Sequence, residues 1–267
     1  MHPAFARVEH RPWPPPVTNW AWRQSWLDLL FAHWPVPAAA VRKLVPPGLA
    51  VDEFQGTTWV GVVPFRMAGV MRRPFPDVPW ISAFPELNLR LYVERDGRPG
   101  VWFLSLDAGN PLAVWGGRRW FHLPYHRAEM SVIPQTTGRL TYRSTRRGSA
   151  PVRFAADYGP TSEPAESQPG TLEHWLTERY CLYAQDLAGC LYRGEIHHVP
   201  WPLQKAAATI ECNELPTPHG LALDGPPALL HYARRLDVVL WPVERVAEPC
   251  RQPERTPLHV RPAFGGT

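Results

Sequence analysis

A chain of 267 residues with 45% hydrophobic content is long enough for one large domain with a sizeable core. Its 33 prolines and its 19% charged fraction favour turns and short elements, which argues against an all-helical bundle. The formal net charge of +4 is modest and the arginines are scattered, so nucleic acid is not expected as a partner.

The compartment is predicted from what the chain does not contain. No stretch approaches 18 uninterrupted apolar residues and the first residues lack the apolar segment of a signal peptide, so no membrane partner is expected. The four cysteines are too widely spaced for a zinc ribbon and are interpreted as free thiols. These features together predict a cytoplasmic protein.

The two ends of the chain differ in composition from its middle. Residues 1–18 and 247–267 are rich in Pro without a period and are interpreted as tails around a single domain of residues 19–246. At the start of that domain, WRQSWLDLLFAHW (22–34) has apolar residues at helical spacing and predicts an amphipathic helix. A second, short helix is predicted at PAAAVRKLV, which Pro46 ends.

From residue 57 the pattern changes to short runs of Val, Trp, Phe and Leu between turn signals, which predict strands. These runs are TTWVGVVPF, LNLRLYVE, GVWFLSL, GRLTYRST, VRFAADY, AATIECNEL and LDVVLWPVE. RDGRPG predicts a hairpin turn between the second and third runs, and helices are predicted near PLAVWGGRRWF and at TLEHWLTERY, where Thr171 is the expected N-cap. The expected fold class is α+β, mainly antiparallel β, with the sheet curled into a barrel or sandwich.

Arginine and histidine side chains are concentrated in GGRRWFHLPYHRAEM, residues 116–130. Pro124 interrupts any helix through His122 and His126, so their spacing does not make a zinc-binding helical face. No metal is therefore expected here.

A second polar group lies in FPELNLRLYV. Alternation along a strand puts Glu86, Asn88 and Arg90 on one face and three leucines on the other. From the residues alone, such a polar face is more often in contact with solvent than part of the wall of a cavity.

A third group lies in RGEIHHVPWPLQKA, where Glu195 and His197 would share one face of a strand and His198 would point to the other. A lone His beside an apolar run is more often structural than catalytic. Next to a carboxylate in a cavity, however, it would be a plausible proton shuttle. Arg179, further upstream, is interpreted as an anchor of a helix end.

Several segments together resemble the YqjF-like family of bacterial proteins, and they are HWPVPAAAVRKLVPPGLAVDEFQGTTWVGVVPFRM, FPELNLRLYV, GVWFLSLDAGNPLAV, LPYHRAEM, TERYCLY and GEIHHVPWPLQKA. That family is similar to the acetoacetate decarboxylase superfamily. The resemblance implies a cone-like antiparallel sheet that encloses a small-molecule cavity.

The same resemblance also implies what the cavity lacks. In the decarboxylases, Gly-Arg-Glu followed by Gly-x-Pro-Lys-Lys places the Schiff-base lysine directly after the proline. Here Tyr125 stands at that lysine's position and His126 at the position of its lysine neighbour, while Arg119 replaces the motif's Glu. A phenol forms no imine, so covalent decarboxylation is not expected at this position.

The resemblance thus implies a small-molecule enzyme that lacks the Schiff-base lysine and uses acid/base chemistry of lyase, hydratase or isomerase type on an oxo- or carboxylate-bearing substrate. Glu86 is the expected base, with Tyr125 and His126 as proton donors. The expected substrate-binding residues are Arg90, Asn88, Arg118, His122, His197 and Trp201. A non-catalytic small-molecule binding protein that uses the same cavity stays the alternative.

The expected partner is a small anionic ligand, because Arg90, Arg118 and Arg119 are placed near one cavity mouth. No cofactor is expected. The chain has two lysines: Lys43 is expected at the surface, and Lys205 is the one alternative site for imine chemistry. Exposed strand edges and aromatic surface are compatible with a homo-oligomer.

Overall fold

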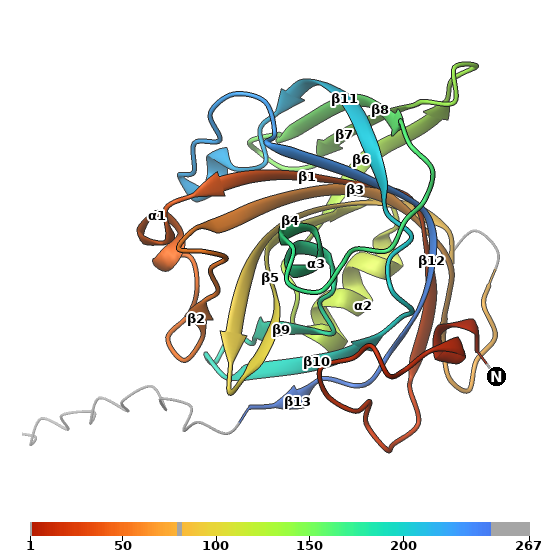
Figure 1. The fold of residues 1–267 in the computed structure, drawn as a ribbon, viewed down its shortest axis with the longest axis vertical. Helices are drawn as coiled ribbons and strands as arrows, with labels where there is room; N and C mark the ends of the chain where they lie inside the picture. The colour runs from red at the N-terminus through yellow and green to blue at the C-terminus, as the bar shows by residue number, and fades with distance from the viewer. Residues whose placement is uncertain (1, 79–81, 247–267) are drawn as a thin grey trace, which may run out of the picture.

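The strands of the chain curl into a ring in a computed structural model, whose described residues are 2–78 and 82–246 (Figure 1). Within these residues there is a 13-stranded sheet in the order β13-β10-β9-β5-β6-β7-β8-β11-β12-β1-β3-β4-β2, and the pairings β10–β12 and β5–β4 close it on itself. The strands are β1 (Trp22–Val36), β2 (Ala50–Val51), β3 (Thr58–Arg72), β4 (Phe84–Arg95), β5 (Arg98–Ala108), β6 (Tyr125–Pro134), β7 (Leu140–Arg146), β8 (Arg153–Pro160), β9 (Cys181–Gln185), β10 (Leu191–His197), β11 (Gln204–Asn213), β12 (Leu229–Leu240) and β13 (Glu244–Arg245). The pairing is antiparallel except where β5 meets β6 and β9. The expected mainly antiparallel, curled sheet is confirmed.

The described residues also form short helices, and two of them lie within the outline of the ring. They are α1 (Ala38–Arg42), α2 (Pro111–Phe121), α3 (Leu172–Thr177) and the 3-10 turns η1 (Pro3–Ala6) and η2 (Thr217–His219). α2 begins where the side chain of Asn110 accepts hydrogen bonds from the first free backbone N–H groups, and Thr171 caps α3 as expected. In Figure 1, α2 and α3 lie within the outline of the ring, so α2 is placed to contribute to its interior.

The helix predicted for residues 22–34 is wrong, because this segment is the strand β1. Asp28 adopts φ 52, and the register with β3 shifts between Leu27 and Ala32. The bulge reverses which side chains face inward, so Trp22 and Trp26 line the interior before it and Leu29 lines it after. A strand with such a reversal spaces its inward residues much as a helix does.

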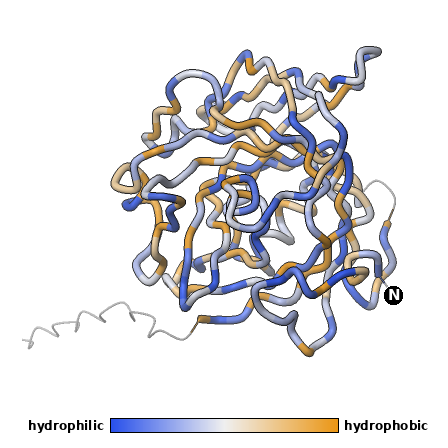
Figure 2. Tube along the Cα trace, viewed as in Figure 1, coloured by the Kyte–Doolittle hydropathy of each residue, from blue (hydrophilic) through white to orange (hydrophobic). Residues whose placement is uncertain are grey.

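Strands β1, β3, β4 and β5 each contribute buried side chains to two hydrophobic cores. On β4, Leu87, Leu89 and Leu91 pack with β7 and β8 in one core, whereas Glu86 faces the other side. Figure 2 shows the corresponding pattern, in which short apolar stretches alternate with polar ones along the strands. The alternation predicted for β4 is therefore present, and its polar face points into the ring.

The N-terminal segment packs on the body, because Ala4 and Arg11 are buried and Arg11 forms an ion pair with Glu195 at 2.9 Å. Residues 247–267, predicted as a tail, lie outside the described residues. Cys181 is a free thiol as expected, but Cys190 is disulfide-bonded, contrary to that expectation. In the described part of the chain, no helix is both long and apolar enough to cross a membrane.

Candidate active site

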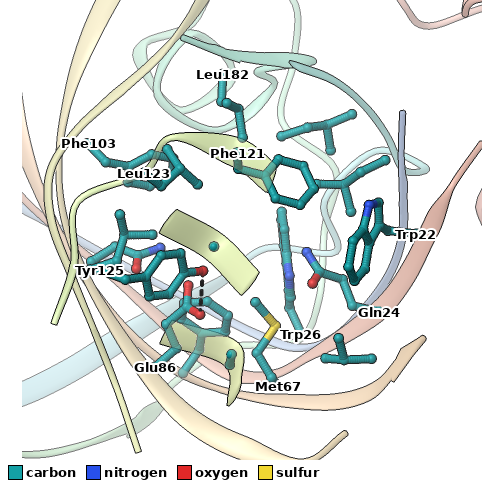
Figure 3. A pocket seen from close by; sticks show the side chains of 18 of the residues that line it. Trp22, Gln24, Trp26, Met67, Glu86, Phe103, Phe121, Leu123, Tyr125 and Leu182 are labelled. Carbon is teal, nitrogen blue, oxygen red and sulfur yellow. Dashed lines mark hydrogen bonds between the residues drawn. The ribbon is translucent and has the colours of Figure 1, made fainter. Parts of the chain in front are cut away.

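A cavity of about 400 Å³ lies inside the ring and is lined by residues of α2 and of strands β1, β3, β4 and β5, among others (Figure 3). Most of its wall is apolar or aromatic, as is usual for small-molecule sites. Its polar lining residues include Gln24, Glu86, Asn88, Arg90, Tyr125, Thr177, Arg179 and His198.

Glu86 and Tyr125 meet in this cavity although they are 39 residues apart in the chain. The hydroxyl of Tyr125 donates a hydrogen bond to Oε2 of Glu86 at 2.9 Å, the dashed line in Figure 3. The two side chains meet because β5 pairs with β4 on one side and with the start of β6 on the other. Their expected convergence on one cavity is confirmed by this geometry.

Burial decides the charge of this pair. Glu86 is 2% exposed, and desolvation raises its pKa to about 8, although hydrogen bonds from Tyr125 and Asn88 act in the opposite direction. Burial and the neighbouring carboxyl group also raise the pKa of Tyr125 well above its ordinary value. At neutral pH the pair is therefore a carboxylic acid hydrogen-bonded to a phenol, without charge.

Gly117 on α2 allows Tyr125 to reach this position. A Cβ added at Gly117 would lie 2.3 and 2.4 Å from the Cδ2 and Cε2 atoms of the Tyr125 ring. The tyrosine ring thus packs directly on the helix backbone, and Arg118 holds the strand beside it by donating from Nε to the backbone oxygen of Tyr125 at 2.7 Å.

Arg90 brings a positive charge to the cavity wall. Its NH2 group donates to the hydroxyl of Tyr92 and to the backbone oxygen of Leu176, both at 3.1 Å, while its Nε is buried without a partner among the described residues. Arg179 also lines the cavity, but it forms an ion pair with Asp52 at 2.5 Å. Within the described residues no carboxylate lies within ion-pair distance of Arg90, so its charge is available to a ligand.

Four of the predicted site residues lie outside the cavity lining. His126 follows Tyr125 on the same strand, so its side chain points to the opposite face, where burial and the charges of Arg146 and Arg118 lower its pKa to about 4. The exposed Arg118 supports the backbone of Tyr125, as described above. Neither His126 nor Arg118 lines the cavity with Glu86, which corrects both expectations.

Two of the predicted histidines also lie outside the cavity lining. His122 caps α2 with φ 54 and packs on Tyr192 at 4.4 Å between ring centroids. His197 is fully buried and stacks on His10 at 5.7 Å. His198 lines the cavity instead, because the chain leaves β10 after His197.

The remaining predicted residues, Asn88 and Trp201, line the cavity with Arg90. Arg179, which was interpreted as an anchor of a helix end, also lines the cavity. Thr177 and Gln24 were missed; Gln24 follows the alternation of β1, which the helix interpretation concealed. Both lysines, Lys43 and Lys205, are exposed and neither lines the cavity. In the described ranges, no three His, Cys, Asp or Glu side chains are grouped so that they could hold a metal ion.

Comparison with known proteins identifies relatives at two levels. The model of the DUF2071 family, described as "Uncharacterized conserved protein", matches residues 23–237. "Uncharacterized protein YqjF" from Bacillus subtilis (strain 168) is 43% identical over 226 residues, which cover 85% of this chain and 93% of that protein.

More distant similarity extends to solved structures. Acetoacetate decarboxylase from Legionella pneumophila subsp. pneumophila str. Philadelphia 1 has a TM-score of 0.61 at 14% identity, covering 92% of this chain and 96% of that one. The enduracididine biosynthesis enzyme MppR, complexed with the condensation product of pyruvate and imidazole 4-carboxaldehyde, has a TM-score of 0.61 at 15% identity, covering 86% and 90%. An acetoacetate decarboxylase-like enzyme from Sphingomonas wittichii RW1 has a TM-score of 0.59 at 15% identity, covering 89% and 97%. The fold is therefore acetoacetate decarboxylase-like, and the chain belongs to the DUF2071 family.

Proposed function

We propose that this protein is an enzyme that performs acid/base chemistry on a small oxo compound without forming a Schiff base. One observation carries the proposal. A neutral carboxylic acid, Glu86, is hydrogen-bonded to Tyr125 in the wall of a ligand-sized apolar cavity. An apolar site that keeps a carboxylic acid neutral at pH 7 enables it to donate a hydrogen bond or a proton to a substrate.

The geometry suggests the role of each oxygen. Tyr125 donates to Oε2 of Glu86, so the acid proton can reside on Oε1 and be donated to a substrate carbonyl. When the C–H bond next to that carbonyl breaks, its electron pair forms the enol as Glu86 delivers its proton to the oxygen, and the proton released from carbon passes to water. The Glu86 carboxylate that remains is the base of the return step. A pKa of about 8 suits both directions near neutral pH. This assignment revises the expected role of Glu86 from a base to an acid.

The positions of the lysines support chemistry without an imine. A Schiff base requires an amine in contact with the substrate. Lys43 and Lys205 are both exposed, and the described cavity lining contains no lysine. The carbonyl is instead activated by hydrogen bonding in a site of low dielectric, where such bonds are stronger than in water.

A non-catalytic binding protein is the second candidate, and the predominantly apolar wall favours it. Such a wall retains a ligand without any chemistry, and His126 and Arg118, two of the groups expected to assist catalysis, lie elsewhere. In this case Glu86 and Tyr125 would supply only a hydrogen bond that orients the ligand.

Exchange of protons for deuterium separates the two candidates. The protein is incubated in D2O with a panel of oxo acids and ketones, and loss of the proton next to the carbonyl is followed by NMR. The proposed enzyme exchanges this proton, and Glu86→Gln slows the exchange by a factor of about a hundred or more while ligand binding remains. A ligand that binds both proteins but exchanges equally slowly in each would establish the binding protein.

A further inference from the structure

We infer that the ligand of the cavity carries an aromatic ring beside its carbonyl and carboxylate groups. That the ligand has a carbonyl group next to Glu86 rests on the proposed function. That it has an aromatic ring does not, because the ring is inferred from binding contacts alone. The size of the cavity is the first argument. A volume of about 400 Å³ lies within the range of about 300–1,000 Å³ that pockets for drug-sized ligands occupy. A three- or four-carbon oxo acid would leave much of that space to water against apolar walls.

The chemistry of the walls is the second argument. Trp22 and Trp26 from β1, Phe103 from β5 and Phe121 from α2 surround the space in front of Glu86 (Figure 3). Trp22 and Phe121 are tilted by 57° with their ring centroids 5.6 Å apart. Walls built from several ring planes offer a ligand ring both stacked and edge-to-face contacts, which aliphatic walls do not offer.

The entrance is the third argument, because it is apolar at the surface. Leu112, Trp115 and Val78 are 56%, 57% and 47% exposed, yet all three line the same cavity as Glu86. Trp120 connects this mouth to the interior, since its ring centroid lies 5.1 Å from that of Trp115 and 5.0 Å from that of Trp22.

Large apolar side chains that remain exposed beside a pocket are typical of a binding groove. A polar oxo acid needs no such path, whereas a ring-bearing one is in contact with apolar surface from the mouth to the acid.

The charge of Arg90 indicates which group the ligand carries at the end opposite its ring. A guanidinium at the wall with no carboxylate partner in the described chain favours an anionic group on the ligand. Glu86 and Arg90 lie on the same face of β4, so one ligand can contact both side chains. The class of compound that matches the cavity size, the aromatic walls, the apolar entrance and the charge of Arg90 is an aryl-substituted oxo acid.

Calorimetric titration with phenylpyruvate, pyruvate and cyclohexylpyruvate tests this class. Phenylpyruvate is expected to bind at least tenfold more tightly than pyruvate, from the burial of its ring, and more tightly than cyclohexylpyruvate. Equal affinity for pyruvate would overturn ring recognition, and equal affinity for cyclohexylpyruvate would overturn its aromatic character. If phenylpyruvate binds as expected but shows no exchange, the proposed function fails and the inferred ligand class stands.

Two matched variants test whether the ring of the ligand binds in this cavity. Ala113→Trp puts a large side chain from α2 into the cavity wall and should weaken phenylpyruvate binding at least tenfold. Ala40→Trp, on the exposed surface of α1, should leave it unchanged. Circular dichroism checks that both variants fold. Tight binding that survives Ala113→Trp in a folded protein would place the ring elsewhere and overturn the inference.

Discussion

The ring of Tyr125 lies on the backbone of Gly117, with no room for even a methyl group between them. Gly117→Ala must therefore displace the ring and break the hydrogen bond to Glu86, and we expect a loss of about 1–3 kcal/mol in the free energy of unfolding. Urea unfolding measures it. Gly109→Ala is the control, because its added Cβ would be 3.5 Å from Pro85 Cδ, an ordinary contact. Equal stability of the two variants would show that Tyr125 does not need this contact.

The raised pKa of Glu86 should make the protein less stable as the pH rises. Between its ordinary value of 4.5 and its folded value of about 8, the folded state holds a proton that the unfolded state has released. Stability then falls with increasing pH by up to about 1.4 kcal/mol per pH unit, and this fall is complete above about pH 8. Glu86→Gln, which has no proton to lose, should abolish this dependence.

The comparison is cleanest between pH 6.5 and 8. Asp107, whose pKa is raised to about 6, and the buried histidines, whose pKa values are lowered, also make stability depend on pH, but they do so equally in both proteins and cancel in the difference. Urea unfolding of wild type and Glu86→Gln at both ends of the window measures the difference. Parallel pH profiles would mean that Glu86 is already ionised in the folded protein at neutral pH.

Tyr125→Phe should raise the pKa of Glu86 further. The tyrosine hydroxyl stabilises the carboxylate form of Glu86. Without it, only the hydrogen bond from Asn88 opposes the effect of burial on the pKa of Glu86. The titration of the carboxyl carbon, followed by 13C NMR of glutamate-labelled protein, reports the shift directly. Tyr192→Phe, which removes a hydroxyl bonded to Asp186, should leave Glu86 unaffected. A lower pKa in Tyr125→Phe would contradict the proposed arrangement.

Arg90→Gln should remove the preference of the cavity for anions. We expect the wild type to bind phenylpyruvate about ten- to a hundredfold more tightly than the neutral ketone phenylacetone, because a hydrogen-bonded charge pair forms in a partly buried site. The variant should bind the two about equally. Arg119→Gln is the matched control, since Arg119 is exposed and does not line the cavity, although the sequence placed it near the mouth. Preferential binding of phenylacetone by the wild type would contradict this role of Arg90.

The sequence predicted the residues of β4 in the cavity wall correctly, but it misplaced His126 and did not reveal the bulge in β1. Strand alternation places Glu86 and Arg90 on one face wherever the strand lies, so this prediction required no tertiary information. His126 was misplaced by the motif alignment, since it follows Tyr125 on a strand and neighbouring residues there point to opposite faces. The bulge at Asp28 could not be predicted, because it depends on a backbone turn with φ 52 that Asp adopts only in a particular tertiary context.

The most direct test of acid/base chemistry without an imine compares two variants in the deuterium exchange assay. The double variant Lys43→Arg, Lys205→Arg contains no lysine at all, whereas Glu86→Gln keeps both lysines. We predict that the lysine-free protein exchanges the substrate proton at the wild-type rate, that borohydride traps no adduct on the wild type, and that Glu86→Gln is slower by a factor of about a hundred or more. Loss of exchange in the lysine-free protein, together with a reduced substrate adduct on Lys205 of the wild type, would contradict the account and establish imine chemistry.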